Sequence, residues 1–576
     1  MCTNSTCTAK TPTRIDNMAK IHTLKISNFK GLENFEHVFG MTDFVCLIGR
    51  GDSGKTTILE AISAVLSPNW NLTFYDTDFF NGNIANPIEL EVSLYDLPAT
   101  LIQESKYGLF IRGLDISTNL IHDDIVDSHV TILTIKLIVD KNLEPKWFVI
   151  NDRVSQQSIE IRASDRASFN VFLVSDYIDR HFSWSKGNPL YSLLKGEDTS
   201  NEKTNIIIDA FREAKEKIDA TSFSHLDSVV DKIKISAKTL GVDITNTNTT
   251  IDFKDISIKD GRICLHENAV PFRQKGKGSK RLISIAIQTE LAKEGGILLV
   301  DEIEQGLEPD RAQHLARTLK SQNKGQVFIT THSRDVLVEL TAKDIFRVKK
   351  GNSKLFTFES SLQACIRSNP EAFFSDRVLV CEGPTEIGIC RGLNNFRISA
   401  GKPNVSFLGV RFANGNGSNQ IEYAKAFKNS GYDVCLFCDS DVTVVNDSKP
   451  ELLKIGINII DCDSNKSIEN HLFEDLPWEA VIALVTYRES EKDEQSVADS
   501  IKSKYSEAFP LDWKNQDSPL MRKAIYDASV TKKNEWFKRT DHGEKLGEIS
   551  CANSIGMKGK KLDLILSELS KWIDNA

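Results

Sequence analysis

One glycine-rich segment, "FVCLIGRGDSGKTTILEAISAVLS", constrains the fold of this 576-residue chain more than any other. Residues 44–48 are a continuous apolar run typical of a buried strand, and residues 56–66 place apolar side chains at helical spacing. Between them, residues 49–56 fit the pattern G-x-x-x-x-G-K-[ST]. A strand, a glycine-rich loop and a helix in this order predict a P-loop, which binds nucleotide phosphates at a helix N-terminus.

Each residue type in this loop has a chemical purpose. Glycines let backbone N–H groups surround phosphate oxygens, a lysine reaches the β- and γ-phosphates, and a hydroxyl can hold Mg²⁺. The residues predicted to bind the nucleotide here are Gly49, Gly51, Gly54, Lys55, Thr56 and Thr57, with Thr56 as a Mg²⁺ ligand. We therefore expect ATP, together with one Mg²⁺ ion, as a cofactor.

Two later apolar runs end on residues that suit ATP hydrolysis. Residues 297–300 are predicted to form a buried strand that ends on Asp301 and Glu302. Asp301 would hold Mg²⁺ through water, and Glu302 would orient and polarise the attacking water. The run "GQVFITTHS" is a further predicted strand, ending at His332 near the expected position of the γ-phosphate.

A basic, glycine-rich turn, "KGKGSKR", lies ahead of the acidic pair and leads through Ser279 into an amphipathic helix. This pattern suits a second phosphate-binding helix start. Taken alone, the turn is interpreted more simply as a solvated charged loop.

The second half of the chain has three predicted strands that end in acids. The acidic residues at or just after these strand ends are Glu382, Glu386, Asp439, Asp441, Asp461 and Glu469. In an open parallel sheet the carboxyl ends of the strands line one crevice, so we expect these side chains to converge. Two like charges at about 4 Å repel by about 4 kcal/mol, and hard divalent cations with oxygen ligands offset such repulsion. The alternative is that each acid caps a helix or ends a strand in solvent.

Composition limits the remaining possibilities. The length predicts two or three domains, the net charge of −9 argues against a binder of bulk polyanions, and no apolar run is long enough for a membrane helix. Scattered cysteines within apolar runs suit a reducing compartment, and we expect a cytoplasmic protein. Residues 1–20 are polar and are predicted to be a disordered tail. The segment "KKNEWFKR" from Lys532 either contacts DNA or is a helix that buries Trp536 and Phe537.

The first set of motifs resembles the ABC-type ATPase head of the RecF/SMC-like branch. "FKGL", the P-loop, "KGKGSKR", "LLVDE" and "TTHS" occur in that family's order. The resemblance implies that two heads sandwich ATP in a homodimer or higher oligomer, with Ser279 of one head contacting the γ-phosphate on the other and His332 as the switch residue. The long coiled coil of SMC proteins is absent, and a helical, dimerising insert is expected at about residues 180–245.

The second set resembles a Toprim domain, through "VCEGPTE" and "CDSD". A RecF/SMC-like ATPase followed by Toprim is similar to the OLD-family nucleases, including the Gabija nuclease subunit and retron-associated effectors. The expected fold is therefore α/β, with an ATPase head at residues 21–370 and a Toprim-like parallel α/β domain with a helical end at 371–576. Carried over, Glu382, Glu386, Asp439, Asp441 and Glu469 would bind two Mg²⁺ or Mn²⁺ ions, with Glu382 and Asp439 catalytic. Lys558 is our choice for the lysine that the family places against the scissile phosphate.

The resemblance implies an ATP-binding, metal-dependent DNA endonuclease that acts in antiphage defence. Its partner would be a helicase, as in Gabija, or a reverse transcriptase with its msDNA, as in retrons. The alternative function is an ATP-driven DNA clamp of the repair type with a non-catalytic Toprim domain.

Overall fold

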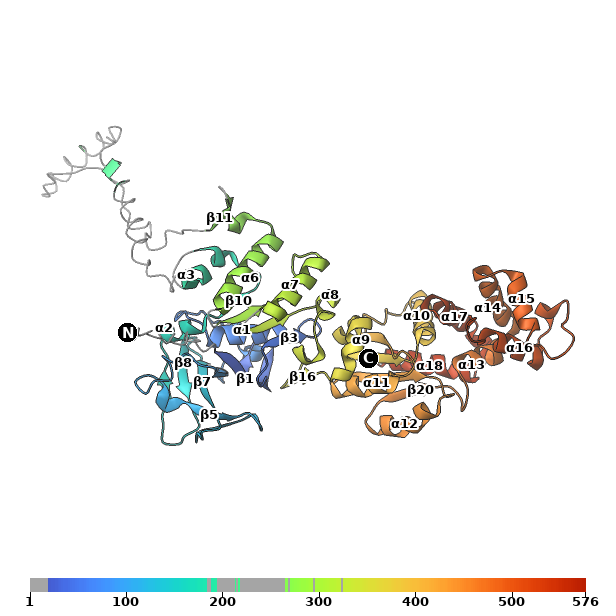
Figure 1. Ribbon diagram of the computed structural model, residues 1–576, viewed down its shortest axis with the longest axis horizontal. Helices are drawn as coiled ribbons and strands as arrows, with labels where there is room; N and C mark the ends of the chain where they lie inside the picture. The colour runs from blue at the N-terminus through green and yellow to red at the C-terminus, as the bar shows by residue number, and fades with distance from the viewer. Residues whose placement is uncertain are drawn as a thin grey trace, which may run out of the picture.

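The computed structural model describes residues 19–183, 188–193, 265–267, 270–293, 296–322 and 325–575, with isolated positions between 213 and 231. Residues 1–18 of the predicted tail and most of the predicted insert at 180–245 lie outside these residues, whereas Lys20, which was predicted to belong to the tail, begins the first strand. Figure 1 shows the two halves of the chain side by side along the long axis. None of the described helices is long and apolar enough to span a membrane.

The first sheet is antiparallel and carries the N-terminal strands. Its order is β2-β1-β4-β7-β5-β6, with β8 paired to β7 and β9 to β8. The strands are β1 (Lys20–Phe29), β2 (Leu32–Val38), β4 (Ile88–Tyr95), β5 (Arg112–Asp115), β6 (Leu120–His122), β7 (Val130–Val139), β8 (Pro145–Ile150) and β9 (Ile159–Glu160). Phe29 pairs with Leu32 across the turn at Lys30 and Gly31, where "FKGL" lies.

The second sheet has the order β10-β13-β14-β3-β15-β16 and is parallel except for β16. Its strands are β3 (Phe44–Ile48), β10 (Phe172–Val174), β13 (Ile297–Val300), β14 (Gln326–Thr330), β15 (Ile345–Arg347) and β16 (Phe356–Thr357). The predicted strands at 44–48 and 297–300 are confirmed, whereas the third ends at Thr330, two residues before His332.

Helix α1 (Lys55–Val65) is packed between these two sheets, because its apolar residues are spaced to bury more than one face. Ile58 and Ile62 share a core with Leu90 of the first sheet and Leu47 of the second. Helices α6 (Lys277–Lys293) and α7 (Pro309–Gln322) cover the opposite face of the second sheet (Figure 1). The shorter elements near them are α2 (Ala163–Arg166), α3 (Pro189–Leu193), α8 (Arg334–Leu337), α9 (Gln363–Ser368), β11 (His266–Glu267) and β12 (Val270–Pro271).

The third sheet is parallel and has the order β18-β17-β19-β20. Its strands are β17 (Arg377–Cys381), β18 (Val410–Asn414), β19 (Asp433–Cys438) and β20 (Asn458–Asp461), and its helices include α10 (Pro384–Ser399), α11 (Gln420–Asn429) and α12 (Thr443–Lys454). The sequence predicted three of these strands. Strand β18 was missed because its short apolar run merges into the glycine-rich turn that follows it.

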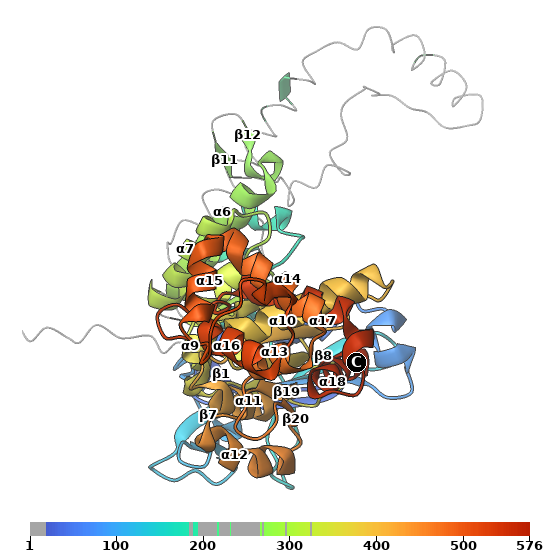
Figure 2. The ribbon, with the colours of Figure 1, turned by 90° about the vertical axis from the view of Figure 1, so that its right-hand side faces the viewer.

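Six helices complete the chain, and Figure 2 views the molecule from the end that they occupy. They are α13 (Ile468–Asp475), α14 (Trp478–Glu491), α15 (Glu494–Lys502), α16 (Pro519–Ser529), α17 (Thr540–Ala552) and α18 (Lys561–Asp574). Helix α17 crosses α10 at very close range, since a Cβ on Gly388 would lie 2.5 Å from the Gly543 Cα and one on Gly547 would lie 3.1 Å from the Gly392 Cα. Glycine at these positions therefore sets where α17 lies relative to the third sheet.

The two halves share a continuous hydrophobic core, in which Val378 and Val380 of β17 join Ile329 of β14. Polar contacts reinforce the junction. Arg50 of the glycine loop forms an ion pair with Asp376 at 3.3 Å, just before β17.

Candidate functional site

The glycine loop after β3 has the conformation that phosphate binding requires. A Cβ on Gly49 would lie 2.4 Å from the Val348 carbonyl oxygen, and Gly54 has a φ of 103°, so both positions need glycine. Gly51 faces open space. The Lys55 Nζ donates to the carbonyl oxygens of Gly49 at 3.1 Å and Arg50 at 2.9 Å, so the ammonium group lies over the loop.

The end of β13 brings a hydroxyl and a carboxylate together beside this loop. Thr56 Oγ1 donates to Asp301 Oδ2 at 3.0 Å, and Thr330 Oγ1 donates to Asp301 Oδ1 at 2.6 Å. Hydroxyl and carboxylate oxygens are the donors that Mg²⁺ prefers, so Thr56 and Asp301 fit the predicted ion. Burial lowers the pKa of Lys55, and Asp301 and Glu302 oppose that shift.

Glu302 has a left-handed backbone, with a φ of 44°, which is uncommon for a residue other than glycine. Its N–H donates to Thr330 Oγ1 at 2.7 Å, which holds this conformation, and its side chain is exposed. An exposed carboxylate on a fixed backbone suits the predicted role of orienting water.

The sequence did not single out Glu304, which connects the loop after β13 to His332, the predicted switch residue. Glu304 accepts hydrogen bonds from Thr331 Oγ1 at 2.7 Å and from the His332 N–H at 2.6 Å. Burial and the nearby Lys55 charge lower the pKa of His332. The run "DEIE" shows a third acid close to Asp301 and Glu302 in the sequence. The backbone of the turn, however, decides which of these acids reaches His332.

The "KGKGSKR" turn is not a solvated loop. Helix α6 begins at Lys277, so Ser279 lies in its first turn, where it is exposed. Arg281 is buried and donates to the Glu302 carbonyl oxygen at 3.0 Å and to Gln305 Oε1 at 2.6 Å. The helix start is therefore fixed against the loop after β13 of the same chain, while Ser279 is free to meet another surface.

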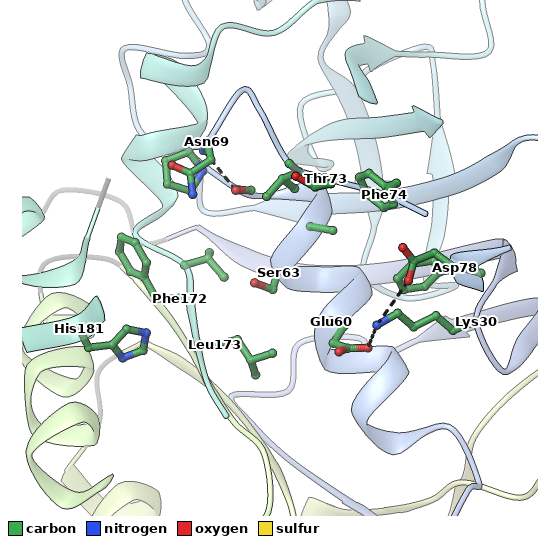
Figure 3. Close-up of a pocket in the computed structure, with 16 residues that line it drawn as sticks. Lys30, Glu60, Ser63, Asn69, Thr73, Phe74, Asp78, Phe172, Leu173 and His181 are labelled. Atoms are coloured by element: carbon green, nitrogen blue, oxygen red, sulfur yellow. Dashed lines mark hydrogen bonds and ion pairs between the residues drawn. The ribbon is translucent and has the colours of Figure 1, made fainter. Parts of the chain in front are cut away.

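A cavity of about 310 Å³ runs alongside α1 (Figure 3). Lys30 of the "FKGL" turn lies at one side, paired with Glu60 at 2.7 Å, and His181 lies at the other. The His181 ring contacts Ser284 Oγ of α6 at 2.6 Å, so the wall of the cavity is connected to the helix that carries Ser279.

In the second half, four predicted acids approach one another at the carboxyl ends of β17 and β19. Glu382 Oε2 accepts from the Asp439 N–H at 3.1 Å. Glu386, one turn into α10, accepts from the Gly383 N–H at 2.7 Å, and Asp439 Oδ1 accepts from the Ile468 N–H at 2.8 Å. The last contact places α13, and with it Glu469, beside the other three. We call Glu382, Glu386, Asp439 and Glu469 the acidic group.

The charges of the acidic group oppose one another. Burial, followed by Glu386, Glu469 and Glu382, raises the pKa of Asp439 to about 9. Burial, followed by Glu469 and Glu382, raises the pKa of Glu386 to about 7. Asp441, two residues beyond Asp439, is exposed.

Lys538 is the lysine that contacts the acidic group. Its Nζ lies 3.1 Å from Glu469 Oε1. Burial lowers the pKa of Lys538, but the charges of Glu469, Glu386 and Asp439 together outweigh burial and raise it. Thr385 Oγ1 holds the segment by donating to the Phe537 carbonyl oxygen at 2.9 Å. Trp536 and Phe537 are buried, as one of the two alternatives for "KKNEWFKR" predicted, although the segment precedes α17 and is not helical.

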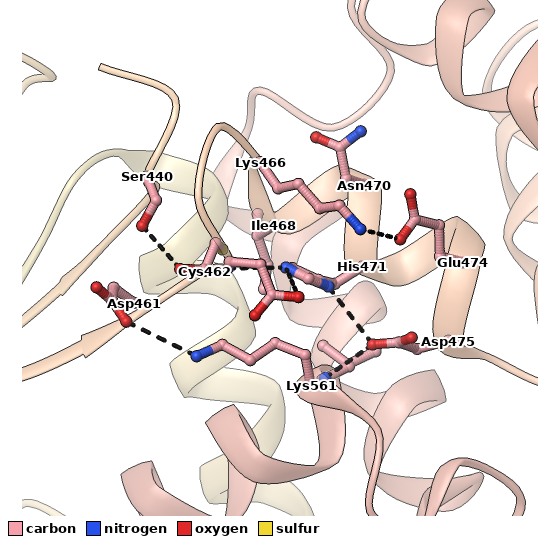
Figure 4. A network of polar contacts seen from close by, with 12 residues as sticks. Ser440, Asp461, Cys462, Lys466, Ile468, Asn470, His471, Glu474, Asp475 and Lys561 are labelled. Carbon is pink, nitrogen blue, oxygen red and sulfur yellow. Dashed lines mark hydrogen bonds and ion pairs between the residues drawn. The ribbon is translucent and has the colours of Figure 1, made fainter. Parts of the chain in front are cut away.

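The structure does not bring Lys558 to the acidic group. Its side chain is exposed and makes no hydrogen bond or ion pair within the described part of the chain. Lys561, three residues further on, lies 3.7 Å from Asp461 at the end of β20, beside the contact between His471 and Asp475 (Figure 4). The Lys561 contact attaches the start of α18 to β20, and the Leu562 N–H, which donates to Asp475 Oδ2 at 2.9 Å, attaches it to α13.

The chemistry of the acidic group fits a divalent cation, because buried oxygen donors with raised pKa values need a positive counter-charge. Among the residues that the structure describes, no three His, Cys, Asp or Glu side chains converge closely enough to enclose one ion. Backbone N–H groups already engage one oxygen each of Glu382, Glu386 and Asp439. The donor set is therefore suitable, and the side chains would have to turn to close around a metal.

The fold and these two sites define a P-loop ATPase joined to a Toprim domain. A family model described as "AAA domain, putative AbiEii toxin, Type IV TA system" matches residues 44–339, and one described as "Overcoming lysogenization defect protein-like, TOPRIM domain" matches residues 373–441. The chain belongs to the OLD (overcoming lysogenization defect) family of ATPase–Toprim proteins. Its two domains indicate ATPase and nuclease activity in general, with nucleotide and divalent-metal binding.

Comparison with solved structures gives matches at low identity. One is the Smc head domain with an extended coiled coil bound to the C-terminal domain of ScpA from Pyrococcus furiosus, at 14% identity, covering 59% of this chain and 95% of that chain, with a TM-score of 0.33. Another is the recombination mediator protein RecF with ATP, at 13% identity, covering 60% and 99%, with a TM-score of 0.31. Comparison with curated proteins gives no match.

Proposed function

We propose that this protein is an endonuclease that cuts DNA at the acidic group with Mg²⁺ or Mn²⁺, under the control of ATP bound at the glycine loop. The observation that supports cleavage is the contact of Lys538 with Glu469 beside three further carboxylates, two of which have raised pKa values. A cation-binding acidic group next to a lysine is what hydrolysis of a phosphodiester needs, because metal ions activate water and stabilise the leaving oxygen.

In this proposal, different residues of the chain bind the metal ions and face the DNA. Glu382, Glu386, Asp439 and Glu469 would hold the ions, with Asp441 at the exposed edge. Lys538 would face the scissile phosphate, since its side chain is 56% exposed and its ammonium group already contacts one of the acids. Lys538 takes the role for which the sequence suggested Lys558.

Control by ATP follows from the position of the glycine loop. Arg50 in that loop forms an ion pair with Asp376, and the next residue begins β17, whose far end carries Glu382. A movement of the loop on nucleotide binding would therefore reach the acidic group through a single strand, β17. We further propose that two heads dimerise around ATP, because Ser279 is exposed on a helix start that its own chain holds rigidly. A role in antiphage defence, with a helicase or a reverse transcriptase as partner, rests on the resemblance of the sequence to Gabija and retron effectors.

The test uses two isosteric variants of the purified protein. Asp439→Asn should abolish metal-dependent nicking of plasmid DNA and leave ATP hydrolysis near the wild-type rate. Lys55→Met should abolish ATP hydrolysis and leave the acidic group intact. Normal nicking by Asp439→Asn would remove the nuclease proposal and favour the DNA-clamp alternative.

A further inference from the structure

A cavity of about 500 Å³ lies between α13, the helix that carries Glu469, and α16. Helix α13 contributes Asn470 and Phe473, and α16 contributes Lys523, Tyr526 and Asp527. Asn470 directly follows Glu469, so their Cα atoms are about 3.8 Å apart. Helix α13 therefore carries a member of the acidic group and a residue of the cavity wall at consecutive positions.

The cavity offers aromatic surface. The Tyr526 ring is half-buried, and the Phe473 ring lies deeper, with its centroid 6.5 Å from that of Phe537. Phe537 precedes Lys538, so Phe473 of the cavity wall packs against the segment that carries the lysine in contact with Glu469. Flat apolar surface of this kind stacks with a nucleobase, whatever its identity.

The cavity also offers unused donors and acceptors. Asn470 Oδ1 accepts from the Ser467 N–H at 2.8 Å, which leaves its amide N–H groups to donate elsewhere. Figure 4 shows Asn470 directed away from His471 and its contacts. Within the described part of the chain, the Asp527 carboxylate and the Lys523 ammonium group make no hydrogen bond or ion pair. A donor amide, an acceptor carboxylate and a cation around a flat surface match the edge of a nucleobase.

The charge of the cavity argues against a simple phosphate site. Arg522 is already paired with Asp517 at 2.5 Å, and Glu474 with Lys466 at 2.5 Å. The remaining Lys523 and Asp527 cancel each other, whereas a phosphate site would gather unpaired cations.

We propose that this cavity binds an unpaired nucleobase of the DNA strand whose backbone crosses the acidic group. The inference rests on the proposed nuclease function and narrows its substrate to single-stranded DNA or to positions where a base leaves the helix. A base within an intact duplex is stacked and paired on both sides, so it cannot enter a cavity.

The experiment measures binding without cleavage, in EDTA. The probes are a short single-stranded oligonucleotide and an abasic strand of the same length, and the readout is the ratio of their dissociation constants. Because both strands carry the same phosphates, this ratio isolates the contribution of the bases. The wild type should prefer the strand with bases by about ten-fold, as expected for loss of a single stacking contact.

Tyr526→Ala should bring this ratio close to one, and Tyr526→Phe should preserve it because the ring remains. Asn470→Asp keeps the oxygen that caps α13 and loses the amide donor, so it should lower the ratio by about three- to ten-fold without unfolding the helix. An unchanged ratio in both Tyr526→Ala and Asn470→Asp would overturn the proposal.

Different experimental results would contradict the proposed nuclease function and the proposed base site. If the wild type shows a Tyr526-dependent base preference but no metal-dependent cleavage, the nuclease assignment is wrong and the base site stands. If the wild type cleaves DNA through Asp439 with no preference for bases over the abasic strand, the base site alone is wrong.

Discussion

Replacing Asp439 with Asn should stabilise the metal-free protein at neutral pH, although it removes a predicted metal ligand. Burial and the neighbouring carboxylates raise the pKa of Asp439 to about 9, whereas an Asp in an unfolded chain has a pKa of about 3.9. The folded state therefore keeps a proton that the unfolded state releases. The raised pKa therefore favours the folded state, with its full contribution to stability below about pH 4. This contribution is lost as the pH rises towards 9.

The size of the effect follows from the pKa difference. At 1.36 kcal/mol per pKa unit, holding this proton at about pH 7 costs at most about 4 kcal/mol, and relaxation of the site reduces this to about 2–4 kcal/mol. Asn does not titrate, and its amide oxygen can still accept from the Ile468 N–H, as Asp439 Oδ1 does at 2.8 Å. The variant should therefore gain this free energy of unfolding at about pH 7 and lose the advantage near pH 4.

Urea unfolding in EDTA, followed by tryptophan fluorescence between about pH 4 and pH 8, measures the effect. Trp536 is 1% exposed and lies two residues before Lys538, so its emission reports on this domain. Added Mn²⁺ should then stabilise the wild type and have little effect on the variant. Asp441→Asn is the control: because Asp441 is exposed, its stability should stay within about 0.5 kcal/mol of the wild type. A metal-free Asp439→Asn that is less stable than the wild type near pH 7 would refute the reasoning.

Two further predictions concern the lysines and the assembly of the sites. Lys538→Ala should reduce DNA cleavage by at least about 100-fold without impairing ATP hydrolysis, because it removes the cation beside the acids. Lys558→Ala, at an exposed position, should cleave as the wild type does, and the opposite order in nicking assays would restore the sequence-based choice. Mixing inactive Lys55→Ala with inactive Ser279→Arg should recover part of the ATPase activity, because a mixed dimer contains one intact composite site. No recovery at any mixing ratio would show that each head hydrolyses ATP alone.

Local pattern predicted most of the nucleotide site. The strands at 44–48 and 297–300 are where their apolar runs place them, and Thr56 meets Asp301 although 245 residues separate them. A buried parallel strand needs a continuous apolar run, and the carboxyl ends of all parallel strands in one sheet lie at the same edge, where the loops after β13 and β3 meet. These requirements are local, so they can be read from the order of residues.

The acidic group could be predicted in part for the same reason, since Glu382, Glu386 and Asp439 lie within a few residues of strand ends. Whether an acid beyond a strand is buried is not a local property. Asp439 is buried because its carboxylate accepts from the Ile468 N–H, whereas Asp441, which has the same residue type, is exposed. The turn after a strand has no repeating pattern of buried positions, so the sequence predicted both residues as metal ligands.

The lysine beside the acids depended wholly on packing between distant segments. Lys538 meets Glu469, 69 residues away, because glycines on α10 and α17 let the two helices touch and Thr385 holds the preceding carbonyl. In the sequence, Lys558 in a glycine-rich basic run was as reasonable a candidate. The chemistry of the side chains identifies the residues that can take part in the reaction. How closely two backbone segments approach decides which of these residues meet.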